Sequence, residues 1–269
     1  MKVNEEEKEI AILFGLSLDK RDDVVSSLEE LERLSETAGI LVRGKMFQNV
    51  KEITPSTLIG SGKVEELKNL VEEKGANLVI CDNELTGSQT KNISDILDVK
   101  VIDRTTLILD IFAKRATTNE GKLQVELAML KYFLPRLSGI VGTSGRFGSG
   151  GVGMRGPGET KIELDKRKIR EKIQKLEEQI KKIKTTRSVQ RQNRLQSKVK
   201  RVSIVGYTNA GKSTLMNIIT KADIYADNKL FATLDATTRN VWLSEGKHIV
   251  LTDTVGFINK LSHSFVDAF

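Results

Sequence analysis

Eight consecutive residues of the 269-residue chain have the types and spacing of a phosphate-binding loop. They run from Gly206 to Ser213 and match the pattern G-x-x-x-x-G-K-[ST] in full. The glycines let the backbone wrap an anion, and the N–H groups of the loop and of the following helix point toward it. Lys212 would carry positive charge to the terminal phosphates, and the Ser213 hydroxyl would bind Mg²⁺. The residues expected to contact nucleotide here are Gly206, Tyr207, Thr208, Asn209, Ala210, Gly211, Lys212, Ser213 and Thr214.

The segments on either side of this loop favour the same interpretation. Residues 201–205 form a short apolar run typical of a strand, and residues 214–219 have helical spacing. A strand, a glycine-rich turn and a helix in this order are the context in which the pattern binds phosphate. The sequence therefore predicts a nucleotide-binding P-loop domain, with Lys212 as its catalytic cation.

A second group of candidate site residues follows further along the chain. Asp253 ends an apolar, strand-like run and begins an Asp-x-x-Gly pattern that closes at Gly256. An Asp at the carboxyl end of a strand can hold Mg²⁺ through water, and the Gly256 N–H can reach a γ-phosphate. A Thr-rich segment between the two motifs offers a second metal-binding hydroxyl at Thr233. The nucleotide-contacting residues expected in these segments are Phe231, Ala232, Thr233, Leu234, Asp235, Asp253, Thr254, Val255 and Gly256.

In this order and spacing, the three segments form the signature of a GTPase. The Asn-Lys-x-Asp motif that reads guanine is not found, because Asn259-Lys260 is followed by Leu261-Ser262. Residues 201–269 are also fewer than the roughly 100–150 residues of an ordinary closed domain. We therefore expect the first half of a P-loop GTPase domain, truncated within this chain, with weak and base-indifferent nucleotide binding.

Composition and charge indicate a cytoplasmic protein with one element that faces a polyanion, and we expect it to be a monomer. The single cysteine, Cys81, lies in an apolar run, which predicts a buried thiol and no disulfide framework. The N-terminus shows no targeting pattern, and no apolar stretch reaches the ~20 residues of a membrane span. The net charge is +7, yet residues 161–201 hold sixteen Lys/Arg against five Asp/Glu. This basic block marks the polyanion-facing element.

Residues 8–117 alternate between strand-like and helix-like runs. Strands spaced by helices of this length predict parallel βαβ units and a compact α/β domain. Gly39 and Gly75 would end the first two helices, and Ser61 would cap the second at its N-terminus. The expected strands are 10–16, 41–50, 77–81 and 99–103, and the expected helices are 22–37, 64–74, 88–97 and 105–116.

Residues 118–200 predict a helical hairpin around a glycine-rich loop. A helix over 122–134 has leucines at 4-3-4 spacing, and a helix over 160–198 has a heptad-like apolar seam. The long helix ends in a basic stretch without acidic residues. This stretch indicates contact with a phosphate backbone, because a helix face that only meets solvent usually carries charges of both signs. The loop, 139–158, would enter a narrow RNA channel, and a flexible linker is the alternative. The RNA-binding residues expected are Arg146, Arg155, Arg187, Arg191, Arg194 and Lys198.

Five motifs in the same order resemble those of the HflX-type GTPases, of the OBG-HflX-like class of P-loop GTPases. They lie at residues 59–67, 103–112, 120–128, 155–160 and 206–214. The resemblance implies three domains: an N-terminal parallel-type α/β domain over 1–117, a helical hairpin over 118–200 and a partial GTPase domain over 201–269.

Members of this family associate with the large ribosomal subunit and its RNA, hydrolyse GTP to GDP with Mg²⁺, and separate stalled ribosomes. The resemblance puts Ser213 and Thr233 in the two Mg²⁺-ligand positions, with Asp253 acting through water. Phe257 stands where many GTPases carry a water-positioning Gln, so slow intrinsic hydrolysis and activation by a partner are expected. The glycine-rich loop would approach the peptidyl-transferase region. The alternative is a non-catalytic ribosomal RNA-binding protein with an inactive nucleotide domain.

Overall fold

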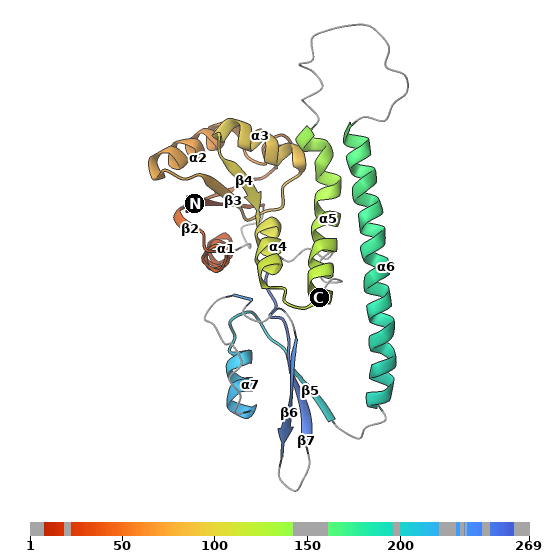
Figure 1. Cartoon of the computed structure of the whole chain (residues 1–269). Helices are drawn as coiled ribbons and strands as arrows, with labels where there is room; N and C mark the ends of the chain where they lie inside the picture. Colours follow the sequence, from red (N-terminus) through yellow and green to blue (C-terminus); the bar gives the residue numbers. More distant parts are fainter. Residues whose placement is uncertain are drawn as a thin grey trace, which may run out of the picture. The chain divides into compact units, whose positions relative to one another are not determined.

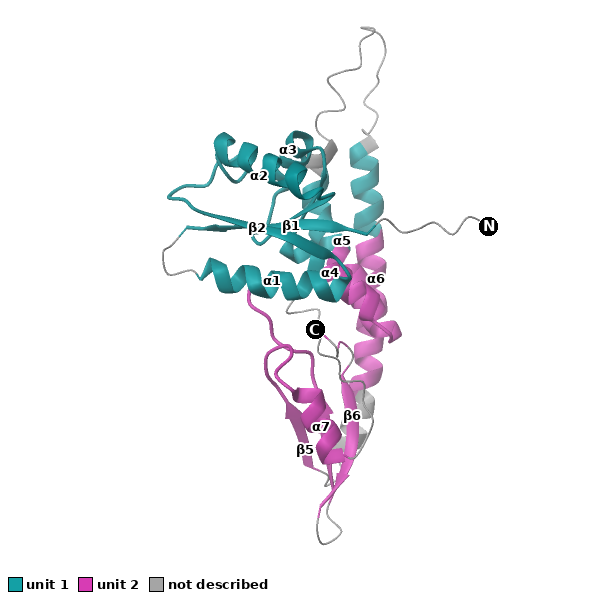
Figure 2. Cartoon of the chain, turned by 90° about the vertical axis from the view of Figure 1, so that its left-hand side faces the viewer, with its two compact units in different colours: residues 1–108, 130–171 teal, residues 109–129, 172–269 magenta. Residues whose placement is uncertain are grey.

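The computed structural model describes residues 8–18, 23–141, 161–195, 200–220, 230–231, 234, 236–243 and 248–260. In chain order its elements are β1 (Ile10–Ser17), α1 (Val24–Ala38), β2 (Leu41–Asn49), α2 (Ser61–Lys74), β3 (Leu78–Cys81), α3 (Gly87–Leu97), β4 (Lys100–Asp103), α4 (Arg104–Arg115), α5 (Asn119–Val141), α6 (Lys161–Leu195), β5 (Lys200–Ile204), α7 (Lys212–Thr220), β6 (Thr237–Trp242) and β7 (His248–Asp253) (Figure 1). They divide into two compact units (Figure 2). The first unit holds residues 1–108 and 130–171, and the second holds residues 109–129 and 172–269.

A parallel sheet in the order β2-β1-β3-β4 forms the centre of the first unit. Its central strands β1 and β3 are buried along almost their whole length. Continuous apolar strands of this kind are typical of a sheet that is covered on both faces. Figure 2 shows α2 and α3 on one side of the sheet and α1 on the other. The predicted parallel α/β domain is confirmed.

Glycines in the left-handed backbone region end the first two helices, as the sequence predicted. Gly39 follows α1 with φ 86°, and Gly75 follows α2 with φ 59°. The predicted cap of α2 is wrong. Ser61 is the first residue of α2, because the helical hydrogen bonds already begin at the carbonyl of Gly60, which precedes it. A side-chain cap occurs instead at α3, where Thr86 takes part in a capping box.

A buried arginine joins the carboxyl edge of the sheet to α1. Arg104 is 1% exposed and donates to Asp82 Oδ1 at 2.7 Å. Its guanidinium also donates to the Ser27 carbonyl at 3.2 Å and to the carboxylate of Glu30. The second oxygen of Asp82 accepts from the Ser27 hydroxyl at 2.7 Å. Charges removed from water need partners of this kind, so the cluster stabilises the position of α1 against the ends of β3 and β4.

The neighbouring carboxylate, Asp103 at the end of β4, holds α5 to the same edge. It accepts hydrogen bonds from the Tyr132 hydroxyl and from the backbone N–H groups of Leu85 (3.1 Å) and Thr106 (2.9 Å). Burial raises the pKa of the Tyr132 hydroxyl, and the negative charge of Asp103 raises it further. The hydroxyl therefore remains a protonated donor. Arg136 lies over the Tyr132 ring, 3.5 Å from its centroid.

Both long helices of the predicted hairpin are present, with changed bounds. α5 extends to Val141 and contains Pro135, so the segment between the helices begins after the predicted residue 139. The leucine face predicted for α5 is only half-buried. The adjacent face is more buried: it carries Val125, Ala128 and Tyr132, and the Tyr132 hydroxyl donates to Asp103. The predicted seam of α6 is confirmed, since its members are all buried or half-buried: Ile162, Ile169, Ile173, Leu176, Ile180 and Ile183.

The second unit contains a sheet in the order β5-β7-β6. β5 and β7 are parallel, with Ile204 opposite Asp253, and β6 and β7 are antiparallel. One face of this sheet contacts α7 through a small core of Met216, Val241 and Leu251. The strand, loop and helix predicted around the phosphate-binding pattern are therefore present, in keeping with the fold expected of a partial P-loop domain.

The single cysteine of the chain is buried. Cys81 is 2% exposed, which confirms the predicted buried thiol. None of the described helices has both the length and the apolar character that a membrane crossing requires. Within the same ranges, no three His, Cys, Asp or Glu side chains come together as a metal-binding group.

Replacing Arg104 with alanine should lower the free energy of unfolding by about 3–5 kcal/mol, because the buried carboxylate of Asp82 and the half-buried carboxylate of Glu30 would lose this cation. Urea unfolding followed by circular dichroism measures the change. The matched control is Lys100→Ala, which breaks an exposed pair with Glu9 and should cost less than about 1 kcal/mol. A loss in Arg104→Ala no larger than in the control would show that the buried cluster does not stabilise the fold.

Candidate functional site

The predicted phosphate loop connects the end of β5 to the first turn of α7. Two of its residues, Asn209 at φ 58° and Gly211 at φ 81°, have left-handed backbone conformations. Glycine enters this region without steric cost, and Asn tolerates it better than most side chains. The helical hydrogen bonds of α7 begin with the Leu215 N–H, which donates to the Gly211 carbonyl at 2.8 Å. Preceding N–H groups at such a helix N-terminus favour a bound anion.

Backbone hydrogen bonds tie this loop to the segment that follows β7. The Thr208 N–H donates to the Phe257 carbonyl at 2.8 Å, and the Phe257 N–H donates to the Gly206 carbonyl at 3.0 Å. A Cβ added to Gly256 would lie 2.6 Å from Thr208 Cα and 2.8 Å from Lys212 Nζ. A glycine is therefore required where the Asp-x-x-Gly pattern ends, and its backbone lies directly beside the loop.

The ammonium of Lys212 is held against the loop. Its Nζ donates to the Tyr207 carbonyl at 2.6 Å, a contact that the sequence pattern did not reveal. Burial lowers the pKa of this ammonium, and the negative charge of Asp253 acts in the opposite direction. An additional anion would stabilise the protonated form, as opposite charges at short range do. Lys212 thus offers a partly desolvated positive charge to a phosphate.

Two groups predicted to hold Mg²⁺ are brought together, one from the loop and one from β7. Ser213 Oγ donates to Asp253 Oδ2 at 2.6 Å, although 40 residues separate them in the sequence. Asp253 is 0% exposed, and the Thr254 hydroxyl donates to the Ile204 carbonyl at 2.7 Å, which orients the chain after β7. A hydroxyl and a carboxylate are the hard oxygen ligands that Mg²⁺ prefers. The side chains present therefore fit this ion.

The third predicted segment lies only partly within the described structure. Ala232, Thr233 and Asp235 lie outside it, so the second metal-binding hydroxyl stays a prediction. Phe231 is 2% exposed, and its ring contacts Phe112 of α4 edge to face, with centroids 4.6 Å apart. A pair of this geometry contributes about 0.5–1.5 kcal/mol beyond the area that it buries. The sequence pattern could not reveal this contact, because the two rings are far apart along the chain.

The residues predicted to bind RNA are also described only in part. Arg187 of α6 is described, and its side chain is 67% exposed. It forms an ion pair at 2.8 Å with Glu120 of α5, a carboxylate that counting charges along α6 could not reveal. Those that lie outside the description are Arg146, Arg155 and Lys198, together with the side chains of Arg191 and Arg194.

Three family models match consecutive parts of the chain. The model described as "GTP-binding GTPase N-terminal" matches residues 25–113, and the one described as "GTP-binding GTPase Middle Region" matches residues 115–194. The third, "50S ribosome-binding GTPase", matches residues 201–268 and includes the phosphate loop and the Asp-x-x-Gly segment.

Curated relatives are similar over nearly the whole chain. GTPase HflX of Caldanaerobacter subterraneus subsp. tengcongensis is 54% identical over 98% of this chain and 61% of its own length. GTPase HflX of Lacrimispora saccharolytica is 50% identical, with 97% and 62% covered, and GTPase HflX of Escherichia coli is 44% identical, with 93% and 58% covered. The chain thus spans 58% to 62% of the length of these relatives.

Two solved structures are similar in fold. The crystal structure of SsGBP in complex with GDP has a TM-score of 0.55 at 26% identity and covers 97% of this chain and 66% of that chain. The crystal structure of a GTP-binding protein from the hyperthermophilic archaeon Sulfolobus solfataricus, also with GDP, has a TM-score of 0.51 at 28% identity, with 97% and 65% covered. Both of those proteins therefore hold a guanine nucleotide.

Replacing Gly256 with alanine should weaken the binding of a nucleoside triphosphate by about five- to 150-fold, since overpacking of this kind costs about 1–3 kcal/mol. The new Cβ would displace either the Lys212 ammonium or the backbone of Thr208. Calorimetric titration with GTP or ATP in the presence of Mg²⁺ measures the ratio of dissociation constants. The matched control is Gly62→Ala, where an added Cβ meets nothing within 4 Å. Equal affinities for wild type and Gly256→Ala would contradict this account of the close approach.

The lowered pKa of Lys212 should make phosphate binding depend on pH. The ammonium form binds the anion, so the affinity should fall as the pH rises through the lowered pKa, earlier than for an exposed lysine. Binding should also take up protons in that alkaline range, because the bound anion raises the pKa again. Calorimetry from about pH 7 to about pH 10, in two buffers of different ionisation enthalpy, measures both effects. A constant affinity without proton uptake would exclude the ammonium from the interaction.

Proposed function

Because the chain belongs to the HflX family of GTPases, we propose that it is a GTP-binding and GTP-hydrolysing factor of the ribosome. It would bind GTP and GDP with Mg²⁺, associate with the large ribosomal subunit and its RNA, and separate or rescue stalled ribosomes. The observation that carries the proposal is the 2.6 Å hydrogen bond between Ser213 and Asp253. It joins the loop half and the strand half of a phosphate site beside the Lys212 ammonium.

Each described part of the site would act on the nucleotide in a distinct way. The N–H groups of the loop and of the α7 N-terminus would bind the phosphates, and Lys212 would neutralise their charge. The Gly256 N–H would hold the γ-phosphate. The Ser213 hydroxyl and, through water, the Asp253 carboxylate would hold Mg²⁺, with Thr233 as the proposed second hydroxyl ligand. When bound, the ion supplies the positive charge that neutralises the reacting phosphate oxygens.

Hydrolysis by this site alone should be slow. Phe257 directly follows Gly256, and its side chain is 59% exposed. A phenyl ring cannot orient an attacking water by hydrogen bonds, as a Gln does in many GTPases. We therefore propose that the bound ribosomal subunit accelerates the reaction. A partner that supplies a stabilising cation can raise GTPase rates by about 10³–10⁵.

The ribosomal contacts would be divided among three domains. They follow one another along the chain: the N-terminal α/β domain over 1–117, the helical hairpin over 118–200 and the partial GTPase domain over 201–269. The glycine-rich loop, 139–158, would approach the peptidyl-transferase region, and the protein would act as a monomer in the cytoplasm. The residues proposed to contact RNA are Arg146, Arg155, Arg187, Arg191, Arg194 and Lys198.

Replacing Arg187, Arg191 and Arg194 with alanine should weaken binding to the large ribosomal subunit and flatten its salt dependence. Each lost phosphate contact should reduce the slope of log K against log salt by about 0.7–0.9. Co-sedimentation with purified large subunits over a series of salt concentrations measures this slope. An unchanged slope in the triple variant would show that this face of α6 does not contact RNA phosphates.

The control variant removes equal charge from exposed positions of the first unit, at Arg33, Arg43 and Lys51. It should bind the subunit with nearly the wild-type slope. Measuring subunit binding with GTP, with GDP and without nucleotide then distinguishes the GTPase from the alternative function. Tighter binding with GTP, together with phosphate release that the subunit accelerates, supports the GTPase. Binding that ignores the nucleotide supports the alternative, a non-catalytic ribosomal RNA-binding protein.

A further inference from the structure

Phe231 has a backbone conformation that is unusual for a bulky side chain. Its φ is 54°, in the left-handed region that a residue with a Cβ enters at a steric cost. Such conformations persist where the surrounding structure holds them. The Phe231 side chain is 2% exposed, and those of Leu230 before it and Leu234 after it are 5% and 8% exposed. Burial of these side chains therefore holds a turn that its backbone alone disfavours.

The ring of Phe231 packs against Phe112 of α4. The two rings meet edge to face, with centroids 4.6 Å apart, and both residues belong to the second unit. Phe112 is itself 1% exposed. It ends the motif over 103–112, a motif that supplies no group to the phosphate site described above. The contact thus connects this motif to the Thr-rich segment of the nucleotide site.

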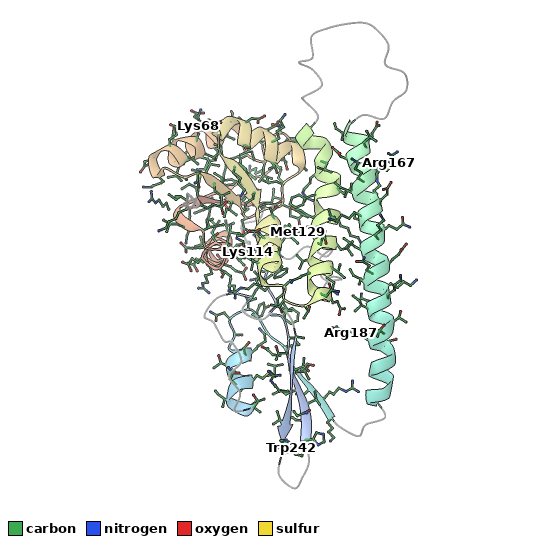
Figure 3. All side chains as sticks on the ribbon, viewed as in Figure 1. Lys68, Lys114, Met129, Arg167, Arg187 and Trp242 are labelled. Atoms are coloured by element: carbon green, nitrogen blue, oxygen red, sulfur yellow. The ribbon has the colours of Figure 1, made fainter. Side chains whose placement is uncertain are left out.

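α4 is a fixed support for this contact. Its exposed face carries Lys114, labelled in Figure 3, which pairs with Asp110 at 3.1 Å. Its other face is buried, and a side chain that is closely packed on a helix has few rotamers open to it. The residues of that face, each 0% to 2% exposed, are Leu107, Ile108, Leu109, Ile111 and Phe112.

The anchored residues bracket the predicted second Mg²⁺ ligand in the sequence. Thr233 itself lies outside the described residues, but it follows Phe231 by two positions and directly precedes Leu234. A segment that folding has already ordered loses less conformational entropy when it binds a ligand. Buried anchors on both sides of Thr233 would therefore favour binding of the metal and its nucleotide.

We propose that Phe112 is a positioning residue of the nucleotide site. By packing against Phe231 it orders the segment that binds Mg²⁺ together with a nucleoside triphosphate. The proposal rests on the proposed GTPase function and adds to it a residue from α4. Segments of this kind are ordered by the γ-phosphate and its Mg²⁺ and are released when that phosphate is lost. Phe112 therefore acts on triphosphate binding with Mg²⁺ and leaves diphosphate binding unchanged.

The test uses Phe112→Leu, which keeps an apolar side chain in α4 and removes the aromatic contact. The 269-residue chain is titrated by calorimetry with GTP and with GDP, each in Mg²⁺ and in EDTA. GTP with Mg²⁺ should bind about five- to thirtyfold more weakly, which is the equivalent of ordering the backbone of one more residue. The affinities for GDP, and for GTP in EDTA, should stay nearly as in wild type.

Two further variants separate this role from general stabilisation. Phe231→Leu should cause the same loss of GTP affinity, and combining it with Phe112→Leu should add little, because both remove one contact. The matched control is Phe14→Leu, since Phe14 is 3% exposed in the core of the first unit. It should lower the melting temperature and leave the ratio of GTP to GDP affinity unchanged.

Amide hydrogen exchange tests the contact without nucleotide or metal. Peptides that cover residues 230–236 should exchange faster in Phe112→Leu than in wild type, because the segment would have lost its anchor. Peptides from β5 and β7 should keep their protection. Equal exchange of residues 230–236 in the two proteins would overturn the proposal.

Three binding results would also overturn it. Equal losses of GTP and GDP affinity in Phe112→Leu are expected of a ring that only stabilises the fold. Unchanged affinity for GTP with Mg²⁺ would show that the segment needs no anchor. Tighter binding of GTP would show that the contact holds the segment away from the nucleotide.

The proposed function fails separately, because its readouts are binding to the large ribosomal subunit and the phosphate release that the subunit accelerates. Loss of both, with the selective effect of Phe112→Leu intact, would reject the ribosomal role and keep the positioning role. Accelerated phosphate release without any selective effect of Phe112→Leu would reject the positioning role alone.

Discussion

The parallel pairing of β5 with β7 is the constraint on which the nucleotide site depends. It sets Ile204 opposite Asp253, so the strand that leads into the phosphate loop ends beside the strand that carries the carboxylate. The two hydrogen bonds of Phe257 with the loop continue this pairing past the strand ends. Backbones this close leave no room for a Cβ at Gly256. This backbone arrangement brings together the Ser213 hydroxyl, the Asp253 carboxylate and the Lys212 ammonium.

The first unit uses the same property of parallel strands with a different result. Asp82 follows β3 and Asp103 ends the adjacent strand β4, so both carboxylates lie at one edge of the sheet. Arg104 pairs with the first, and the Tyr132 hydroxyl donates to the second. These partners bind α1 and α5 to the sheet edge and make it a structural support. In the second unit the carboxylate of Asp253 meets a small hydroxyl, a partner that can share a metal ion with it.

The distribution of charge connects the two proposed binding activities. In the described part of the second sheet and its loops, the one carboxylate is buried, whereas cations such as Arg201 and Arg239 are exposed. With this carboxylate buried, the charged side chains exposed in the described part of the sheet are cations. Exposed cations favour polyanions, and both a nucleoside triphosphate and RNA are polyanions. The metal-binding carboxylate and these exposed cations can therefore occur on one sheet.

Local features of the sequence determined the elements and the phosphate loop. The apolar runs, the helix-ending glycines Gly39 and Gly75, and the pattern over 206–213 each depend on a few consecutive residues, whose periodicity and backbone preferences act over short range. The ends of helices were less predictable, because a single hydrogen bond can move an end by one residue. The helical bonds of α2, for example, begin at the Gly60 carbonyl. Only the tertiary structure decided that Arg104 is buried between two carboxylates and that Arg187 pairs across helices. Such contacts depend on which distant segments the fold brings within a few ångströms, a distance that sequence separation does not specify.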